Sequence, residues 1–176
     1  MRVFIAFEVS QEAKEKLLNA QKKLQTDNAK LNLTKSFHLT LKFLGEITPA
    51  RAEETRKKLE TIQFQKFTAK LNGTGVFPEE NHIRVVWAGI EPKDTICELQ
   101  HKIDEALGEK EKDFQPHITL ARVKHVKDKK QFTEHIKKLK IEPISFEVKE
   151  FKLIQSKLGS QGPEYTDLAT YSAKDL

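Results

Sequence analysis

The segments Phe37-His38-Leu39-Thr40-Leu41-Lys42 and Pro116-His117-Ile118-Thr119-Leu120 repeat one pattern, in which a histidine and a threonine alternate with apolar residues. Successive side chains of a β-strand point to opposite faces of the sheet. Each segment therefore predicts a half-buried strand, with an apolar face against a core and a polar face that presents an imidazole beside a hydroxyl. These two strands decide the fold that we expect, because the rest of the chain is arranged around them in the same order.

The two motifs belong to a repeated plan along the chain. Their histidines lie at positions 38 and 117, and the same offset of 79 residues aligns the segments on either side. Halves 1–80 and 81–176 each read as strand, helix, motif strand, helix and closing strand. The expected elements around the motifs are strands Val3–Val9, Phe67–Phe77, Ile83–Ile90 and Phe146–Ile154, and helices Ser10–Leu24, Thr48–Leu59, Lys93–Leu107 and Asp128–Leu139. We therefore expect one bilobal domain over 1–176, formed by internal duplication, in which pseudo-two-fold symmetry brings the motif strands face to face across a cleft.

Three further segments complete this plan. The stretch Ser156–Pro163 is rich in turn-forming residues and predicts a loop. Tyr165–Tyr171 then predicts a last strand. The charged segment Gly108–Asp113 predicts an exposed loop after the helix of the second half.

The paired histidines suit acid–base chemistry at phosphorus without a metal ion, because one imidazole takes a proton while the other gives one. The ordinary pKa of histidine lies near 6.5, so His38 and His117 can fill either role near neutral pH. A single histidine on a strand is usually structural, whereas the repeated His–Thr pair favours a catalytic role. The hydroxyls of Thr40 and Thr119 are expected to donate hydrogen bonds to nonbridging phosphate oxygens.

Two basic residues are candidates for phosphate binding. Strict alternation places Lys42 on the polar face with His38 and Thr40, and places Phe43 on the apolar face. The same rule places Arg122 on the apolar face of the second motif strand. Its guanidinium then reaches a phosphate only if the strand ends, bulges or lets the side chain curl round. A solvated lysine is the alternative interpretation of Lys42.

The composition fits a soluble protein with an anionic partner. The 176 residues carry a net charge of +5 with a sequence pI of about 9.1, which suits RNA but is also common among other soluble proteins. Cys97 is the only cysteine, so an intrachain disulfide is excluded and a cytoplasmic location is expected. No apolar stretch approaches the roughly 18–20 residues of a membrane span, and the apolar run at the N-terminus is too short for a signal peptide. We expect a monomer without a membrane partner.

The motifs and their flanks resemble the two-histidine (2H) phosphoesterase superfamily, and within it the RNA 2′,3′-cyclic phosphodiesterases, also called 2′-5′ RNA ligases. The resemblance covers essentially the whole chain and rests on Arg2–Phe7, Phe37–Glu46, Arg84–Gly89, Pro116–Val123, Ser156–Gly159 and Gly162–Tyr165. It implies an enzyme that hydrolyses a 2′,3′-cyclic phosphate at an RNA end to a 2′-phosphomonoester, without a metal ion or other cofactor. It also implies that RNA ends, tRNA fragments among them, are the partners.

The resemblance further implies a fold and a division of roles. The expected fold class is α+β, with two pseudo-symmetric lobes that are each a mostly antiparallel sheet with helices on the outer side, and with the active-site cleft between the lobes. His38 is implied to protonate the leaving 3′-oxygen, and His117 to activate water. Arg122 matches the family's basic position after the second motif.

The residues leave three alternatives open. An ATP-independent 2′-5′ ligase would join RNA halves, a noncatalytic module would only bind RNA ends, and an esterase for a cyclic nucleotide or an ADP-ribose cyclic phosphate would use the same chemistry. Phe4, Phe7, Phe77 and Trp87 are candidates for a platform on which a base stacks, although aromatic residues at strand spacing are usually core residues.

Overall fold

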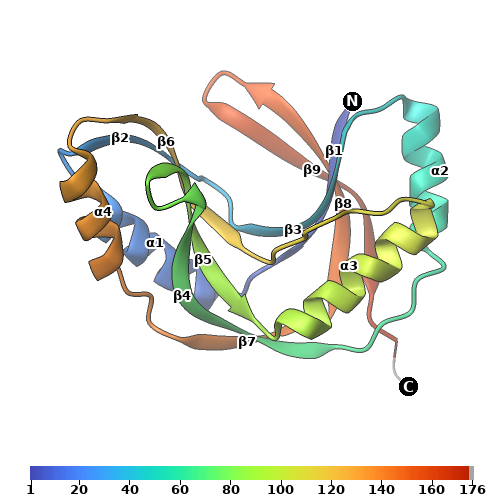
Figure 1. Cartoon of the computed structure of the whole chain (residues 1–176). Helices are drawn as coiled ribbons and strands as arrows, with labels where there is room; N and C mark the ends of the chain where they lie inside the picture. The colour runs from blue at the N-terminus through green and yellow to red at the C-terminus, as the bar shows by residue number, and fades with distance from the viewer. Residues whose placement is uncertain (175–176) are drawn as a thin grey trace.

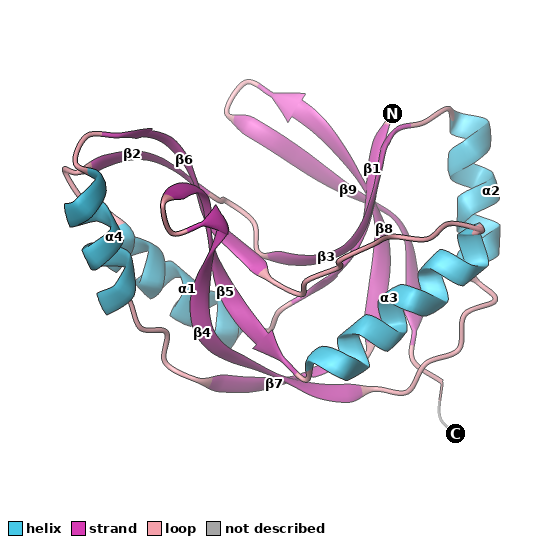
Figure 2. Ribbon diagram, viewed as in Figure 1, coloured by secondary structure: helices cyan, strands magenta, loops and turns pink. Residues whose placement is uncertain are grey.

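The computed structural model describes residues 1–174, which contain four helices and nine strands (Figures 1 and 2). In chain order the elements are β1 (Arg2–Glu8), α1 (Gln11–Leu24), β2 (Ala29–Leu33), β3 (His38–Glu46), α2 (Pro49–Leu59), β4 (Phe67–Glu79), β5 (His82–Glu91), α3 (Lys93–Leu107), β6 (Ile118–Val126), α4 (Lys129–Lys138), β7 (Ile144–Val148), β8 (Glu150–Gly159) and β9 (Gly162–Ser172). None of the helices in residues 1–174 is long and apolar enough to cross a membrane.

The strands form two antiparallel sheets. The first has the order β3-β1-β8-β9 and the second the order β2-β6-β5-β4-β7, and all neighbouring strands run antiparallel. In Figure 1, α2 and α3 flank the first sheet, while α1 and α4 flank the second. Helix α1 contacts β6 and β7, and α3 contacts both β3 and β5. The expected α+β fold with two antiparallel lobes is confirmed.

The two lobes exchange strands between the halves of the sequence. The motif strands occupy corresponding places, because β3 pairs with β1 and β6 pairs with β5, the first strand of its own half. The closing strand of the first half, β4, nevertheless pairs with β5, and β8 of the second half pairs with β1. Each sheet therefore contains residues from both halves, so neither half of the sequence forms a lobe alone. Internal duplication stays a prediction.

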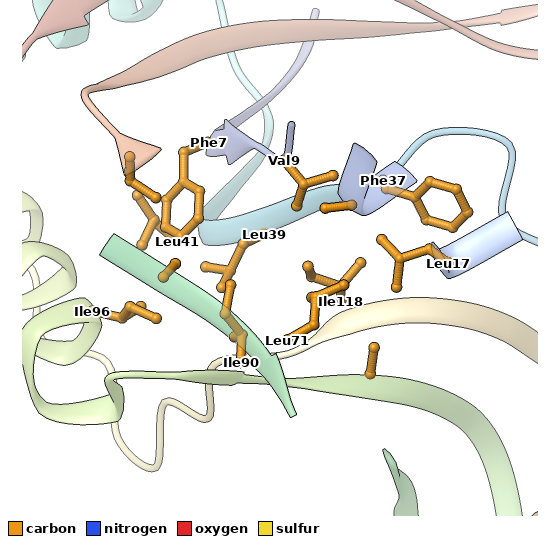
Figure 3. Close-up of a cluster of buried hydrophobic side chains, with 14 of the residues drawn as sticks. Phe7, Val9, Leu17, Phe37, Leu39, Leu41, Leu71, Ile90, Ile96 and Ile118 are labelled. Carbon is orange, nitrogen blue, oxygen red and sulfur yellow. The ribbon is translucent and has the colours of Figure 1, made fainter. Parts of the chain in front are cut away.

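The apolar residues of both motifs pack into one core cluster. Leu39 and Leu41 of β3 and Ile118 of β6 are fully buried, and Figure 3 shows their side chains in the same cluster. Complete burial of one such side chain contributes about 1.5–3 kcal/mol. Because this core holds one face of each motif strand, the alternating polar residues must face away from it.

The helices begin and end within one residue of their predicted bounds. Three of them start with a side-chain cap: Ser10, Thr48 and Asp128 each accept a hydrogen bond from the backbone N–H three residues later, at 3.1, 3.1 and 3.0 Å. Such caps satisfy donors that have no partner inside the helix. The helix boundaries are thus encoded locally.

The strands depart from the predictions in three places. The sequence pattern does not predict β2, because apolar and polar residues alternate there over only five residues. The stretch Ser156–Pro163 is mostly strand rather than loop, because β8 continues to Gly159 and β9 begins at Gly162. The predicted strand Phe146–Ile154 is divided between β7 and β8, which belong to different sheets.

The other two predicted segments are confirmed. Tyr165–Tyr171 lies within β9, which forms a long hairpin with β8. The residues of Gly108–Asp113 lie outside helices and strands and are exposed.

Candidate active site

A β-bulge interrupts the first motif strand immediately after Thr40. Thr40 pairs with Ala6 and Lys42 pairs with Ile5, so Leu41 is an extra residue on β3. An extra residue shifts the alternation by one position and turns the following side chains to the opposite face. Strict alternation, on which the predicted faces depend, therefore fails beyond Leu41.

The bulge exchanges the places of Lys42 and Phe43. Lys42 turns into the protein, where its side chain is 7% exposed and its Nζ lies 2.6 Å from Oδ1 of Asp104. Phe43 is 69% exposed and lines the same cavity as His38 and Thr40. The prediction that Lys42 shares the polar face of the motif is wrong, and its expected contact with phosphate loses its basis.

The second motif strand has a bulge at the corresponding place. Thr119 and Ala121 pair with consecutive residues of β5, which leaves Leu120 as the extra residue on β6. Arg122 is therefore turned to the side of Thr119, and both line the cavity. Arg122 occupies the place in the second repeat that Phe43 occupies in the first. The sequence allows Arg122 to reach a phosphate if the strand bulges, and this bulge is present in β6.

The polar faces of the two motif strands meet in one cavity of about 950 Å³. His38 and Thr40 line it from β3, and Thr119 and Arg122 line it from β6. Other parts of its lining are Arg2 and Phe4 of β1, Asn32–Ser36 before the first motif, and Ser156–Leu158, Gly162, Pro163 and Tyr165 of the β8–β9 hairpin. The structure thus brings four of the six predicted site residues together, whereas His117 precedes β6 and lies outside this lining.

Basic side chains outnumber acidic ones around the cavity. Arg2, Lys35, Arg122 and Lys157 are part of its lining, and within residues 1–174 Glu46 is the one acidic residue in it. Lys35 also donates a hydrogen bond through Nζ to the backbone carbonyl at the β8–β9 turn, which joins the β2–β3 loop to that hairpin. Such a lining favours an anionic ligand.

His38 lies at the start of β3 and is largely buried. Its Nε2 lies 3.8 Å from Oε1 of Glu8 on β1, and its side chain is 12% exposed. Phe4 and Tyr165 approach the imidazole edge-on, with ring centroids 5.6 and 5.1 Å away. Desolvation lowers the pKa of His38 below its ordinary value, because it outweighs the attraction of the Glu8 carboxylate.

His117 is held in one tautomer by the chain that precedes it. Its Nδ1 lies 2.7 Å from the backbone carbonyl oxygen of Gln115. A carbonyl oxygen only accepts, so Nδ1 carries the proton and Nε2 of the neutral ring is free to take one. Phe77 and Trp87 pack against the ring, with centroids 4.9 and 6.1 Å away. Desolvation lowers the pKa of His117, and the hydrogen bond to Gln115 opposes this effect only in part.

The sequence pattern does not reveal the apolar wall of the cavity. Phe43, Leu158 and Tyr165 are 69%, 90% and 40% exposed, and all three line the cavity. Among the described residues, the only other large apolar side chain with such exposure is Leu18. Strict alternation assigns Phe43 to the core because it does not account for the bulge at Leu41. Leu158 is not expected at the site from the sequence, because it lies in Ser156–Pro163, whose composition predicts a loop.

The four predicted candidates for base stacking have different surroundings. Phe7 is a core residue, 1% exposed. Phe77 and Trp87 pack against His117. Phe4 lines the cavity but is only 7% exposed, and its ring is tilted against that of Phe43 at a centroid distance of 6.1 Å. The exposed aromatic rings of the cavity are therefore those of Phe43 and Tyr165, neither of which is among the four, and Phe43 is the more exposed.

A family model described as the 2′-5′ RNA ligase superfamily matches residues 7–159, which include both motifs. The chain belongs to the 2′-5′ RNA ligase superfamily. It is 34% identical over 170 residues to a protein of Methanocaldococcus jannaschii named RNA 2′,3′-cyclic phosphodiesterase, covering 94% of this chain and 96% of that protein. It is 31% identical over 177 residues to a protein of Archaeoglobus fulgidus with the same name, covering 97% and 99% of the two chains.

Solved structures share the fold of this superfamily member over nearly its whole length. The crystal structure of E. coli LigT with phosphate aligns with a TM-score of 0.77 and 25% identity, covering 99% of this chain and 98% of LigT. A protein of Thermus thermophilus aligns with a TM-score of 0.75 and 29% identity, covering 98% and 97% of the two chains. The family and fold implied by the two motifs are confirmed.

Proposed function

We propose that this 2′-5′ RNA ligase superfamily member hydrolyses the 2′,3′-cyclic phosphodiester ends of RNA to 2′-phosphomonoesters. The observation that carries the proposal is the cavity in which His38 and Thr40 of one motif meet Thr119 and Arg122 of the other. The names of the relatives from Methanocaldococcus jannaschii and Archaeoglobus fulgidus support the choice of substrate. The basic lining supports a polyanionic ligand.

In the proposed reaction His117 is the base and His38 the acid. Nε2 of His117 takes a proton from a water molecule, whose oxygen attacks phosphorus in line with the 3′-oxygen. The bond between phosphorus and the 3′-oxygen breaks, and His38 gives its proton to that oxygen. The tautomer imposed by Gln115 supports the role of His117. The Glu8 carboxylate attracts a proton on His38, although desolvation outweighs this attraction and the pKa of His38 stays below its ordinary value. The scheme needs no metal ion or other cofactor, because the two imidazoles move both protons.

The remaining motif residues act on the phosphate. Thr40 and Thr119 donate hydrogen bonds to its nonbridging oxygens, where negative charge grows in the transition state. The Arg122 guanidinium binds the same oxygens or the next phosphate of the strand through charge-assisted hydrogen bonds. All three side chains line the cavity together with His38.

One incubation separates the proposed reaction from its alternatives. RNA with a 2′,3′-cyclic phosphate end is incubated with the protein in EDTA, with and without a second RNA that has a 5′-hydroxyl end. Hydrolysis predicts a 2′-phosphate end in both samples. A joined RNA as the main product would favour the ligase, and bound but unchanged RNA would favour a noncatalytic module. Turnover of only a cyclic mononucleotide or an ADP-ribose cyclic phosphate would identify the related esterase. Inhibition by EDTA that added metal reverses would contradict the metal-free scheme.

The pH profile of kcat/KM should be bell-shaped with its centre below pH 6.5. The base must be deprotonated and the acid protonated, so the rate rises through one histidine pKa and falls through the other. Desolvation lowers both of these pKa values from the ordinary 6.5 in the free protein, and kcat/KM reports the free protein. Initial rates at low substrate concentration between pH 4 and 9 test this. A centre above 6.5, or a profile with one limb, would contradict the assignment.

Phe43→Ala should raise the KM for a cyclic-phosphate RNA by about 5- to 150-fold, which corresponds to the roughly 1–3 kcal/mol of one base stacked on an aromatic ring. Phe43 offers an exposed ring in the cavity, so its loss removes binding while the motif residues keep their places. Leu18→Ala is the matched control, because Leu18 is also an exposed apolar residue but lies outside the cavity. Equal KM values for the two variants would exclude Phe43 as the platform.

A further inference from the structure

Charged side chains form a cluster around Lys42, which is turned away from the cavity. Nζ of Lys42 lies 2.6 Å from Oδ1 of Asp104, 3.2 Å from Oε2 of Glu109 and 3.9 Å from Oε2 of Glu111. The side chains of Lys42 and Asp104 are 7% and 4% exposed. Oδ2 of Asp104 accepts hydrogen bonds from Nε2 of Gln100 at 3.0 Å and from the backbone N–H of Glu111 at 2.8 Å. The proposed reaction uses none of these groups.

The cluster connects the strand of one motif histidine to the segment that leads to the other. Lys42 lies four residues after His38, directly beyond the bulge of β3. Two of its acidic partners, Glu109 and Glu111, follow α3 in the segment Gly108–Asp113. From there the chain continues through Gln115 to His117. All residues of Gly108–Asp113 are exposed. Ion pairs and hydrogen bonds therefore hold Gly108–Asp113, whereas the next stretch before His117 is also held by the partly buried Phe114 and the buried Pro116.

The second motif shows that the bulge itself does not require a buried charge. Ala121 occupies the place that corresponds to Lys42, and it is fully buried. There the bulge is held by Gln21 of α1, whose Nε2 donates to the backbone carbonyl of Leu120 at 2.9 Å. Gln100 of α3 follows Gln21 at the offset of the repeat, but it donates to an acidic partner of Lys42 instead. The charge of Lys42 thus serves a contact that the second motif lacks.

We propose that Lys42 is a positioning residue that fixes His117 relative to His38 through its ion pairs with the three carboxylates. The inference rests on the proposed function, which assigns both histidines to one reaction. Lys42 does not touch the substrate, and it acts by holding the segment before His117 against β3. Misplacement of a reacting group by about 1 Å can reduce a rate by about 10²-fold, so the effect falls on kcat rather than on binding.

Lys42→Met tests this role, because it keeps a long side chain and removes the charge. Its kcat on cyclic-phosphate RNA should fall by about 10- to 100-fold, with KM close to that of the wild type. Lys42→Arg keeps the cation and should recover part of kcat. Ile136→Ala is the control for lost stability, because Ile136 is a buried residue of α4 that belongs neither to a motif strand nor to the charged cluster of Lys42. Assayed well below its melting temperature, this control should keep the wild-type kcat, and an equal fall of kcat in the control would overturn the inference.

A double-mutant cycle distinguishes positioning from a general loss of structure. If Lys42 acts through His117, Lys42→Met should not lower the residual kcat of His117→Ala further. If Lys42→Met only loosens the fold, it should lower the kcat of the wild type and the residual kcat of His117→Ala by the same factor. That second result would overturn the inference.

A spectroscopic measurement keeps the inference testable even if the wild type hydrolyses no cyclic phosphate, a result that would refute the proposed function alone. The imidazole proton signals of His117, assigned with His117→Ala, should shift in Lys42→Met and stay in place in Ile136→Ala. Signals of His117 that do not change in Lys42→Met would contradict the positioning role, whatever the activity.

Discussion

Replacement of either His38 or His117 by alanine should lower kcat on RNA 2′,3′-cyclic phosphate by about 10²–10⁴, the range typical of one general acid or base. Phe4 and Tyr165 pack against the imidazole of His38, and Phe77 and Trp87 pack against that of His117, so neither position has a second imidazole beside it among these contacts. KM should change little, since the cavity wall and Arg122 remain. Single-turnover rates with saturating protein measure the chemical step directly.

The control for these variants is His101→Ala. His101 is 66% exposed on α3, where it lies near Glu105, and the proposed reaction does not involve it. Its substitution should leave kcat unchanged. Wild-type turnover by either motif variant, or an equal loss in His101→Ala, would contradict the acid–base assignment.

Asp104→Ala should reduce the free energy of unfolding by about 3–5 kcal/mol at pH 7, the cost of removing one partner of a buried ion pair. Asp104 is 4% exposed, and its loss leaves the ammonium of Lys42 buried with only two more distant carboxylates. Each kcal/mol corresponds to roughly 2–4 °C in the melting temperature of a chain of this size. Urea unfolding of the two proteins measures the difference. The exposed carboxylate of Glu53, paired with Arg56, offers the control Glu53→Ala, which should melt close to the wild type.

The difference in free energy of unfolding between the wild type and Asp104→Ala should become smaller at acidic pH. Burial alone would raise the pKa of Asp104, but its hydrogen bonds to Lys42, Glu111 and Gln100 outweigh burial and hold the pKa below the ordinary value. A carboxyl group with a lowered folded-state pKa stabilises the protein above its unfolded pKa, and this contribution is lost as the pH falls through the folded pKa. The wild type should therefore approach Asp104→Ala in stability below about pH 4. A difference that stays constant between pH 7 and pH 3 would show that packing, and not charge, explains the loss.

Local signals in the sequence account for much of the fold. Caps such as Ser10 and Thr48 place the helix starts, and the alternation around His38 and His117 identifies both motif strands. The expected convergence of the motifs is also met for Thr40 and Thr119, which share one cavity although they are far apart in the chain. These features are readable because propensity, capping and alternation act over a few residues.

The remaining features depend on contacts between distant segments. The bulges at Leu41 and Leu120 add one residue relative to the neighbouring strand, and nothing within the motif reveals this extra residue. The bulge reverses the places of Lys42 and Phe43, so one predicted phosphate ligand becomes a buried ion-pair partner and a predicted core ring becomes exposed. The exchange of β4 and β8 between the sheets likewise depends on tertiary pairing rather than on local pattern.

The most direct measurement is the pH dependence of the single-turnover rate for the wild type, His38→Ala and His117→Ala on the same cyclic-phosphate RNA. The wild type should give a bell. Without the acid, His38→Ala should lose the fall at high pH and keep the rise, and His117→Ala, without the base, should lose the rise at low pH and keep the fall. A complete bell in either variant would contradict the claim that these two histidines are the acid and the base of one reaction.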